Sequence, residues 1–389
     1  MNIKYSVILK DTLKPAGGPS GYLYNLKKSL ESNNIDSIQL LTYGLGQDKV
    51  RSSRKKAFKR YIKKLKTKLI PVLIREKYFR QKEKQEYFSF YSEIESNLKN
   101  TRLKHFHHTK DFYYYKSLYN NSKDITLLMS HAPEPPHIEL EHVYQADGYS
   151  KKRAVFLAKH QKEMDIYSFK NADYIIFPCQ EAVAPYQKFF DEFDIDIKKL
   201  RFIITTSDPL KYNLPVEIFK KNHHISTKKT ILAYVGRKTK IKGYDIFCDA
   251  AKLLVDDTRF YFIAAGAGPI PSPALKNFLD IGWTDDPGSL INSADFLIVP
   301  NRDTYFDLGI IQALSLNTSL LMTHTGGNRW FADKHLNVDF FDTKAQTLAE
   351  IIQNTKVCTS ENNVRFFNKN LNNKYFAPNY LKLYEGLTD

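Results

Sequence analysis

The chain has 389 residues, of which 42% are hydrophobic and 26% charged, and it contains three cysteines. This composition is typical of a soluble globular protein and excludes a disordered chain or a disulfide framework. The formal net charge of +16 is concentrated in residues 51–84, where 15 Lys or Arg residues accompany two Glu. No apolar run reaches the ~18 residues of a spanning helix. Residues 1–10 predict a strand and not a signal peptide, so we expect a cytoplasmic protein.

Both halves of the chain alternate short apolar runs with longer amphipathic stretches, a pattern typical of two doubly wound α/β domains. Helices are predicted, for example, at 22–31 and 244–254. Strands are predicted at 4–9, 37–43, 103–108, 125–131, 172–178, 230–236, 259–266, 294–300 and 318–324.

The polar stretch 214–229 lacks a clear period and predicts the link between the two domains. We therefore expect a first doubly wound domain over 1–212, which includes the basic insert 51–84. A second such domain is expected over 213–368. Near the end of the chain, within 369–389, a closing helix is predicted by apolar residues at helical spacing: Tyr380, Leu383, Tyr384 and Leu387.

A glycine-rich turn follows the first predicted strand. Gly17, Gly18 and Gly21 stand directly before a helical pattern. Backbone N–H groups at a helix N-terminus favour an anion. The spacing matches neither a Walker loop nor the dinucleotide fingerprint, so this stretch taken alone predicts an ordinary turn between a strand and a helix.

The stretch YVGRKTKIKGYD, residues 234–245, carries a stronger signal for a bound anion. An apolar strand ends at Gly236, Arg237 follows it, and Lys242 precedes the next predicted helix. An arginine fork and a lysine ammonium on two sides of one loop can hold phosphate oxygens. A solvated basic turn is the alternative for this loop alone.

Later strand ends favour the ligand interpretation, because ligands of open parallel sheets lie outside the carboxyl ends of the strands. Gly266 and Gly268 end the next strand and permit a close backbone approach to a ligand. The following two strands lead into the polar stretch 301–309 and the glycine-rich stretch 325–327. We therefore expect four consecutive strand ends to form one binding edge.

These motifs resemble those of the family-4 retaining glycosyltransferases, enzymes with the GT-B architecture of two facing Rossmann-like domains, and the similarity covers nearly the whole chain. The resemblance implies that the loop at Gly236 holds the diphosphate of a nucleotide-sugar donor and that His131 lies beside the transferred sugar. It also implies that the Rossmann-like domain 1–212 lies on the acceptor side, that the Rossmann-like domain 213–368 binds the nucleotide sugar, and that the closing helix crosses back onto the first domain. The other residues assigned to donor binding are Gly18, Gly266, Trp283, Thr284, Asp303, Thr304, Phe306, Asp307, Leu308, Gly309 and Gln312.

One position departs from the family pattern. The paired glutamates of the family, spaced eight apart, fall on Thr304 and Gln312. Gln312 can still hydrogen-bond ribose hydroxyls, whereas Thr304 supplies no carboxylate near the sugar and diphosphate. Asp303 and Asp307 flank Thr304 and are the candidate replacements.

The predicted chemistry needs no metal or other cofactor. Two fixed cations and helix N-terminal amides can neutralise a departing diphosphate while positive charge builds on the anomeric carbon. The sequence shows no carboxylate pair at a strand end that would predict a divalent ion, and His105 and His107 lack a third metal ligand at a legible spacing. We assign catalytic roles to Arg237, Lys242 and His131, and expect a UDP- or GDP-linked sugar as donor substrate.

The basic insert contains an apolar stripe at helical spacing, formed by Phe58, Tyr61, Ile62, Leu65 and Leu69. Basic residues surround this stripe, and we assign to membrane contact Lys55, Lys59, Arg60, Lys63 and Lys64. The profile predicts an amphipathic helix on an anionic membrane surface. A solvated helix packed on the first domain is the alternative. No recognised nucleic-acid-binding fold accompanies the insert, so nucleic acid is not the expected partner.

The sequence thus predicts a retaining, metal-independent hexosyltransferase, associated peripherally with the inner face of the membrane. Its acceptor is expected to be a glycan or a lipid-linked molecule. The departure at Thr304 and Gln312 motivates the alternative, a non-catalytic glycosyltransferase-like subunit that binds a glycan or a partner enzyme.

Overall fold

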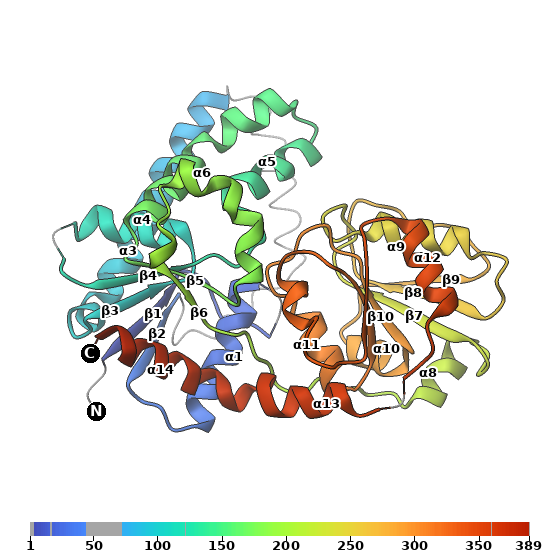
Figure 1. Ribbon diagram of the computed structural model, residues 1–389. Helices are drawn as coiled ribbons and strands as arrows, with labels where there is room; N and C mark the ends of the chain where they lie inside the picture. The colour runs from blue at the N-terminus through green and yellow to red at the C-terminus, as the bar shows by residue number, and fades with distance from the viewer. Residues whose placement is uncertain (1–3, 16–17, 44–71, 121, 359, 389) are drawn as a thin grey trace.

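The computed structural model describes residues 4–15, 18–43, 72–120, 122–358 and 360–388. Two α/β domains are visible, each built on a six-stranded sheet in which all paired strands are parallel (Figure 1). The predicted architecture of two doubly wound domains is therefore confirmed. The five residues assigned to membrane contact, Lys55, Lys59, Arg60, Lys63 and Lys64, lie outside the described residues, as does Gly17.

The first sheet has the strand order β2-β1-β3-β4-β5-β6. Its strands are β1 (Tyr5–Leu9), β2 (Ile38–Thr42), β3 (Leu103–Phe106), β4 (Ile125–Met129), β5 (Tyr174–Phe177) and β6 (Leu200–Phe202). Strand β2 lies on one side of β1, and β3 and all later strands lie on the other side. The carboxyl ends of β1 and β3 therefore form a topological switch point. The helices of this domain are α1 (Gly18–Ser32), α3 (Val72–Lys99), α4 (Thr109–Leu118), α5 (Pro136–Ala146), α6 (Lys151–Asn171), η1 (Glu181–Phe189), α7 (Phe190–Phe193) and η2 (Ile197–Lys199).

The second sheet has the order β12-β11-β10-β7-β8-β9, and its switch point lies between β7 and β10. The strands are β7 (Thr230–Val235), β8 (Phe260–Ala265), β9 (Phe278–Gly282), β10 (Phe296–Val299), β11 (Ser319–Thr323) and β12 (Val338–Phe341). Its helices are α8 (Val216–Asn222), α9 (Tyr244–Leu253), α10 (Pro287–Ser293), α11 (Leu308–Ser315), η3 (Gly326–Phe331) and α12 (Ala345–Asn354).

The end of the chain returns from the second domain to the first. It forms α13 (Asn362–Phe366), the turns η4 (Phe367–Leu371) and η5 (Asn373–Tyr375), and then α14 (Phe376–Thr388), drawn in red along the base of Figure 1. The predicted closing helix is confirmed, because α14 packs on α1 and its Tyr380 hydroxyl donates to the Tyr22 hydroxyl at 2.9 Å. Tyr380 and Tyr384 are fully buried.

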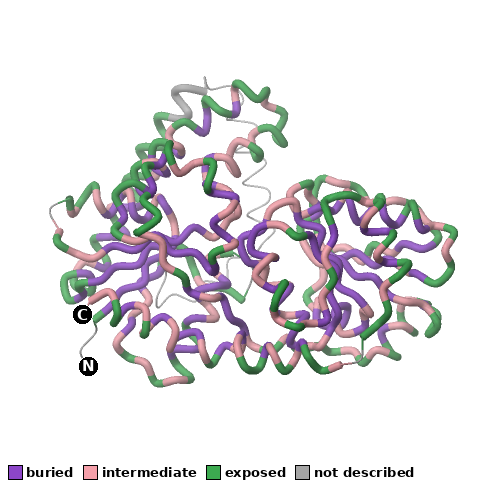
Figure 2. Tube along the Cα trace, viewed as in Figure 1, coloured by how far each residue is buried: buried purple, intermediate pink, exposed green. Residues whose placement is uncertain are grey.

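Buried residues concentrate along the two sheets and the helix faces that cover them (Figure 2). All nine predicted strands are present, whereas β6, β9 and β12 were not predicted. The stretch 214–229, predicted to link the two domains, contains the helix α8. The chain after His131 forms α5 from Pro136 onward.

Two kinds of feature are absent from the described residues. No helix in this part of the chain is long and apolar enough to cross a membrane. Within the same part of the chain, no group of three or more His, Cys, Asp or Glu side chains is arranged to hold a metal ion.

Candidate functional site

The loop that joins β7 to α9 lies at the switch point of the second sheet. The Tyr234 hydroxyl donates to the carbonyl oxygen of Arg237 at 2.7 Å and so ties the loop back to its own strand. The Gly236 amide donates to the carbonyl oxygen of Ala265 at 3.0 Å, which continues the parallel ladder with β8. The loop therefore has a defined backbone path at the edge where a ligand of this fold is expected.

Two glycines permit this path. Gly266 has φ +127°, and a Cβ atom there would lie 1.9 Å from the carbonyl oxygen of Gly236. Gly243, which precedes α9, has φ +63°, and a Cβ atom there would lie 1.8 Å from the carbonyl oxygen of Pro300. Any side chain at either position would push apart the loops that follow β7, β8 and β10.

The cations of this loop have different surroundings. The Arg237 side chain is 65% exposed and points toward the first domain, where its Nη1 lies 3.4 Å from Oε1 of Glu139 on α5. The Lys242 side chain is 29% exposed, and its Nζ donates to Oδ2 of Asp307 at 2.6 Å. Lys238, by contrast, is buried and pairs with Asp280. Arg237 thus reaches the first domain, Lys242 pairs with a carboxylate of its own domain, and Lys238 supports the fold.

Asp307 is the N-cap of α11 and lies among several donors. Its Oδ1 accepts from the Gly309 amide at 3.1 Å, and its Oδ2 accepts from Asn301 Nδ2 at 3.1 Å in addition to Lys242. Burial alone would raise the pKa of the Asp307 carboxyl, but the Lys242 ammonium and these hydrogen bonds lower it to about 2. The carboxylate is therefore ionised under all ordinary conditions.

Several residues predicted to bind the donor are used inside the domain instead. Thr304 is 2% exposed, and its hydroxyl donates to the carbonyl oxygen of Thr325 at 2.8 Å. Phe306 is buried against the aromatic rings of Trp330 and Phe331. Leu308 packs against the hydrophobic core. These three side chains support the glycine turn at the start of η3 and the beginning of α11.

The remaining donor-binding candidates lie nearer the surface. Gln312 is half-buried on α11. Asp303 is also half-buried, and burial raises the pKa of its carboxyl, opposed by the Lys188 ammonium of the first domain. Trp283 is 77% exposed after β9, and Thr284 accepts a hydrogen bond from the Asp286 amide at 3.0 Å. None of these side chains is buried in the hydrophobic core.

In the first domain, His131 follows β4 and is held by a second histidine. Nδ1 of His107 and Nε2 of His131 are hydrogen-bonded at 2.8 Å, and their rings stack. On the other side of His107 lies His105, whose Nδ1 bonds to the Tyr384 hydroxyl of α14 at 2.8 Å. Burial lowers the pKa of His131 to about 3 and that of the other two well below the usual range. All three imidazoles are neutral at physiological pH.

A cavity of about 660 Å³ lies at the switch point of the first sheet. Its lining includes Pro19 beside Gly18, the exposed first residue of α1, and also Glu139, which is the partner of Arg237. Its polar walls come from the ends of β1 and β3, from α3 and from the start of α4: Lys10, Asp11, Lys82, Glu83, Glu86, His108, Lys110 and Asp111. The cavity therefore opens beside the cation loop of the second domain.

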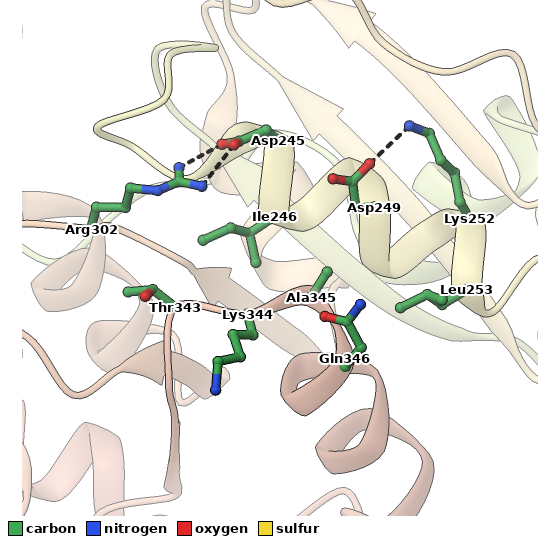
Figure 3. Close-up of a pocket in the computed structure, with 10 residues that line it drawn as sticks. All are labelled: Asp245, Ile246, Asp249, Lys252, Leu253, Arg302, Thr343, Lys344, Ala345 and Gln346. Atoms are coloured by element: carbon green, nitrogen blue, oxygen red, sulfur yellow. Dashed lines mark hydrogen bonds and ion pairs between the residues drawn. The ribbon is translucent and has the colours of Figure 1, made fainter.

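A second cavity, of about 450 Å³, lies between α9 and the start of α12 (Figure 3). The Arg302 guanidinium makes two hydrogen bonds to Asp245 at its edge, each 2.7 Å long. The lining contains neither Arg237 nor Lys242. With the stretch 234–245 this surface hollow shares only its last residue, Asp245.

Sequence reasoning missed three of the residues that build the site. None of Glu139, Asn301 and His107 was assigned a role at the site. The sequence pattern could have indicated Asn301, since it lies two residues after the buried strand β10 at the switch point. The contacts of Glu139 and His107 depend on partners far away in the chain.

Comparisons with known proteins agree with this geometry. Residues 229–355 match the protein family described as Glycosyl transferases group 1. No curated protein sequence matches the chain.

Solved structures resemble nearly the whole chain. Sucrose-phosphate synthase from Thermosynechococcus elongatus has 15% sequence identity and a TM-score of 0.66, with 99% of each chain covered. HepE from Anabaena, in complex with UDP-glucose, has 11% identity and a TM-score of 0.63 over 98% of this chain and 99% of that one. An α,α-trehalose-phosphate synthase from Burkholderia xenovorans, in complex with glucose-6-phosphate, has 11% identity and a TM-score of 0.63 over 97% and 99%. The chain therefore has the GT-B fold, and its second domain, which carries Arg237 and Lys242, contains the match to the glycosyltransferase group 1 family.

Proposed function

We propose that the protein is a retaining, metal-independent glycosyltransferase that moves a hexose from a UDP- or GDP-linked sugar to a glycan or lipid-linked acceptor. The observation that carries this proposal is the position of Arg237 and Lys242. Both extend from one loop at the switch point of the second sheet, and Arg237 reaches Glu139 of the first domain. The group 1 match over the same domain and the UDP-glucose bound to HepE support a nucleotide-sugar donor.

In this mechanism the two cations neutralise the diphosphate as it leaves the anomeric carbon. Gln312 binds the ribose, and the neutral imidazole of His131 contacts the transferred sugar from the first domain. The acceptor occupies the 660 Å³ cavity beside Glu139. The leaving phosphate takes the proton of the acceptor hydroxyl on the same face of the sugar, so no dedicated side-chain base is required.

The first prediction concerns Arg237. Release of sugar is measured across a panel of nucleotide sugars, first for the wild type and then for Arg237→Ala. Removing a cation that acts on the departing diphosphate should cost about 2 kcal/mol or more of transition-state stabilisation, roughly a 30-fold fall in kcat/KM. Lys240→Ala is the matched control, since this exposed lysine belongs to the same loop and has no assigned role.

A non-catalytic glycan-binding or partner-binding subunit is the second candidate. It is favoured by Thr304, which is buried and hydrogen-bonded within its own domain where the family pattern has a glutamate. Absence of sugar release across the whole panel, with glycan binding retained, would support this candidate and contradict the enzyme. Equal activity of Arg237→Ala and wild type would contradict the diphosphate role.

We place the enzyme at the inner face of the membrane. The apolar stripe and the basic residues that motivated this location, within residues 55–69, lie outside the described residues, but α6 offers a further basic and apolar surface. Lys151, Lys152, Val155 and Phe156 are all exposed in its first two turns. Exposed apolar residues beside lysines are typical of a surface that binds anionic lipid.

A further inference from the structure

The two cations assigned to the diphosphate, Arg237 and Lys242, are already paired with carboxylates. The pair between Arg237 and Glu139 is exposed on both sides and 3.4 Å long. The pair between Lys242 and Asp307 is shorter, at 2.6 Å, and its side chains are only 29% and 24% exposed. An exposed pair contributes little, whereas a shielded and hydrogen-bonded pair is much stronger. The second pair is therefore the one that an incoming anion has to break.

The carboxylate of Asp307 lies where donors from three segments converge. Lys242 comes from the loop after β7, Asn301 follows β10, and the Gly309 amide belongs to the first turn of α11. A cation, a side-chain amide and a helix N-terminal N–H together form the type of site that binds a phosphate oxygen. In this protein the Asp307 carboxylate fills that site.

We propose that Asp307 is an internal anion which occupies the subsite for a donor phosphate group, so that a nucleotide donor binds only by displacing it from Lys242. This inference rests on the proposed function, because it takes the donor to be a nucleoside diphosphate sugar. Asp307 then sets donor affinity and selects against ligands with a single negative charge. A diphosphate carries enough charge to replace the carboxylate, since it can contact Lys242 and Arg237 together.

A merely supporting role for Asp307 makes the opposite prediction. If the carboxylate served only to hold Lys242 in place and to cap α11, its removal would weaken diphosphate binding. Asn and Ser are both favoured N-cap residues and can accept the Gly309 hydrogen bond without a charge. The sign of the change in affinity therefore separates an occupant of the subsite from a support for it.

The experiment is isothermal titration of wild type, Asp307→Asn and Asp307→Ser with UDP, GDP, uridine and guanosine at one ionic strength. Both variants should bind the accepted nucleoside diphosphate about tenfold more tightly or better than wild type. Their affinity for the nucleoside should stay unchanged, because it carries no phosphate. Asp249→Asn is the matched control: it removes an exposed carboxylate that pairs with Lys252 in the same domain, and should change either affinity by less than about twofold.

Two outcomes would overturn the inference. Weaker or unchanged diphosphate binding by both Asp307 variants, with measurable binding by wild type, would refute the internal anion and leave the proposed function standing. Equal strengthening by Asp249→Asn would show a general charge effect instead of an occupied subsite. If neither the wild type nor the variants bind UDP or GDP, the donor proposal fails together with the inference.

Discussion

Three histidines of the first domain, His105, His107 and His131, lie in a row from α14 to the end of β4. Burial is the main influence on each of them, and the neighbouring imidazoles add mutual repulsion. Their folded pKa values lie below the ordinary value of about 6.5. Between those values and 6.5 the unfolded chain binds more protons, so the stability that depends on these histidines is complete above pH 6.5 and decreases as the pH falls.

The second prediction, also at the scale of single residues, follows from this linkage. At pH 5 each histidine that stays neutral in the folded state should lower the free energy of unfolding by about 2 kcal/mol relative to pH 7. His107→Asn keeps a side-chain donor near His131 but cannot titrate, so it should reduce the loss between pH 7 and pH 5 by about that amount. Urea unfolding at the two pH values measures the difference.

The wild type has to be compared with His107→Asn because the buried Asp111 changes the free energy of unfolding with pH in the opposite direction. Burial raises the pKa of the Asp111 carboxyl to about 7, so the stability linked to its protonated form decreases as the pH rises from about 4 to 7. Asp111 contributes equally to wild type and to His107→Asn, and its effect cancels in the difference. An identical loss of stability in the two proteins would contradict the neutral state of His107.

At the scale of elements, the sequence predicted the inner strands and the edge strand β2, and missed the other three edge strands. The inner strands are covered on both faces and appear as continuous apolar runs, such as residues 230–235 of β7. The missed strands β6, β9 and β12 all lie at an edge. They are short and partly exposed, so their side chains do not form an apolar run. Their pairing depends on the neighbouring strand and not on a local pattern.

The third prediction tests the backbone contact between the loops after β7 and β8. Gly266→Ala places a methyl group against the carbonyl oxygen of Gly236 at a positive φ. We expect a loss of more than about 1 kcal/mol in the free energy of unfolding and weaker binding of the accepted nucleoside diphosphate, because Arg237 moves with the loop. Thermal unfolding and titration calorimetry measure the two effects.

Gly148→Ala is the control for this substitution. Gly148 also has a positive φ, +91°, but a Cβ atom there would meet no other atom within 4 Å. Its position between α5 and α6 is distant from the donor loop in the chain. The Gly148→Ala variant should be less stable than wild type because of backbone strain, and it should bind nucleotide with wild-type affinity. Wild-type affinity in Gly266→Ala would show that the contact with Gly236 does not position the site.

At the scale of the whole molecule, the sequence identified the residue types of the site better than their contacts. Arg237 and Lys242 were recognisable because a buried strand, a glycine and a helix start frame them within one short stretch. Their partners were not, since Glu139 is 98 residues away from Arg237 and Asp307 is 65 residues away from Lys242. Such contacts arise from the domain arrangement and the sheet order. The departure at Thr304 gained meaning only when its side chain was found to be buried.

The fourth prediction concerns the proposed contact of α6 with an anionic membrane. If α6 contacts anionic lipid, the protein should float with vesicles that contain phosphatidylglycerol and remain unbound with neutral phosphatidylcholine vesicles. Charge reversal of Lys151 and Lys152 to Glu should reduce the bound fraction, since each lysine near an anionic surface contributes about 1 kcal/mol. Phe156→Ser should reduce it by removing apolar contact area.

The same charge reversal at Lys220 and Lys221 on α8 is the matched control, because it changes the net charge equally but lies on the second domain. Its bound fraction should equal that of wild type. Equal losses in the two double variants would indicate a nonspecific response to net charge. Flotation that does not depend on the charge of the lipid would contradict the membrane location itself, while leaving the donor loop and its prediction for Arg237 unaffected.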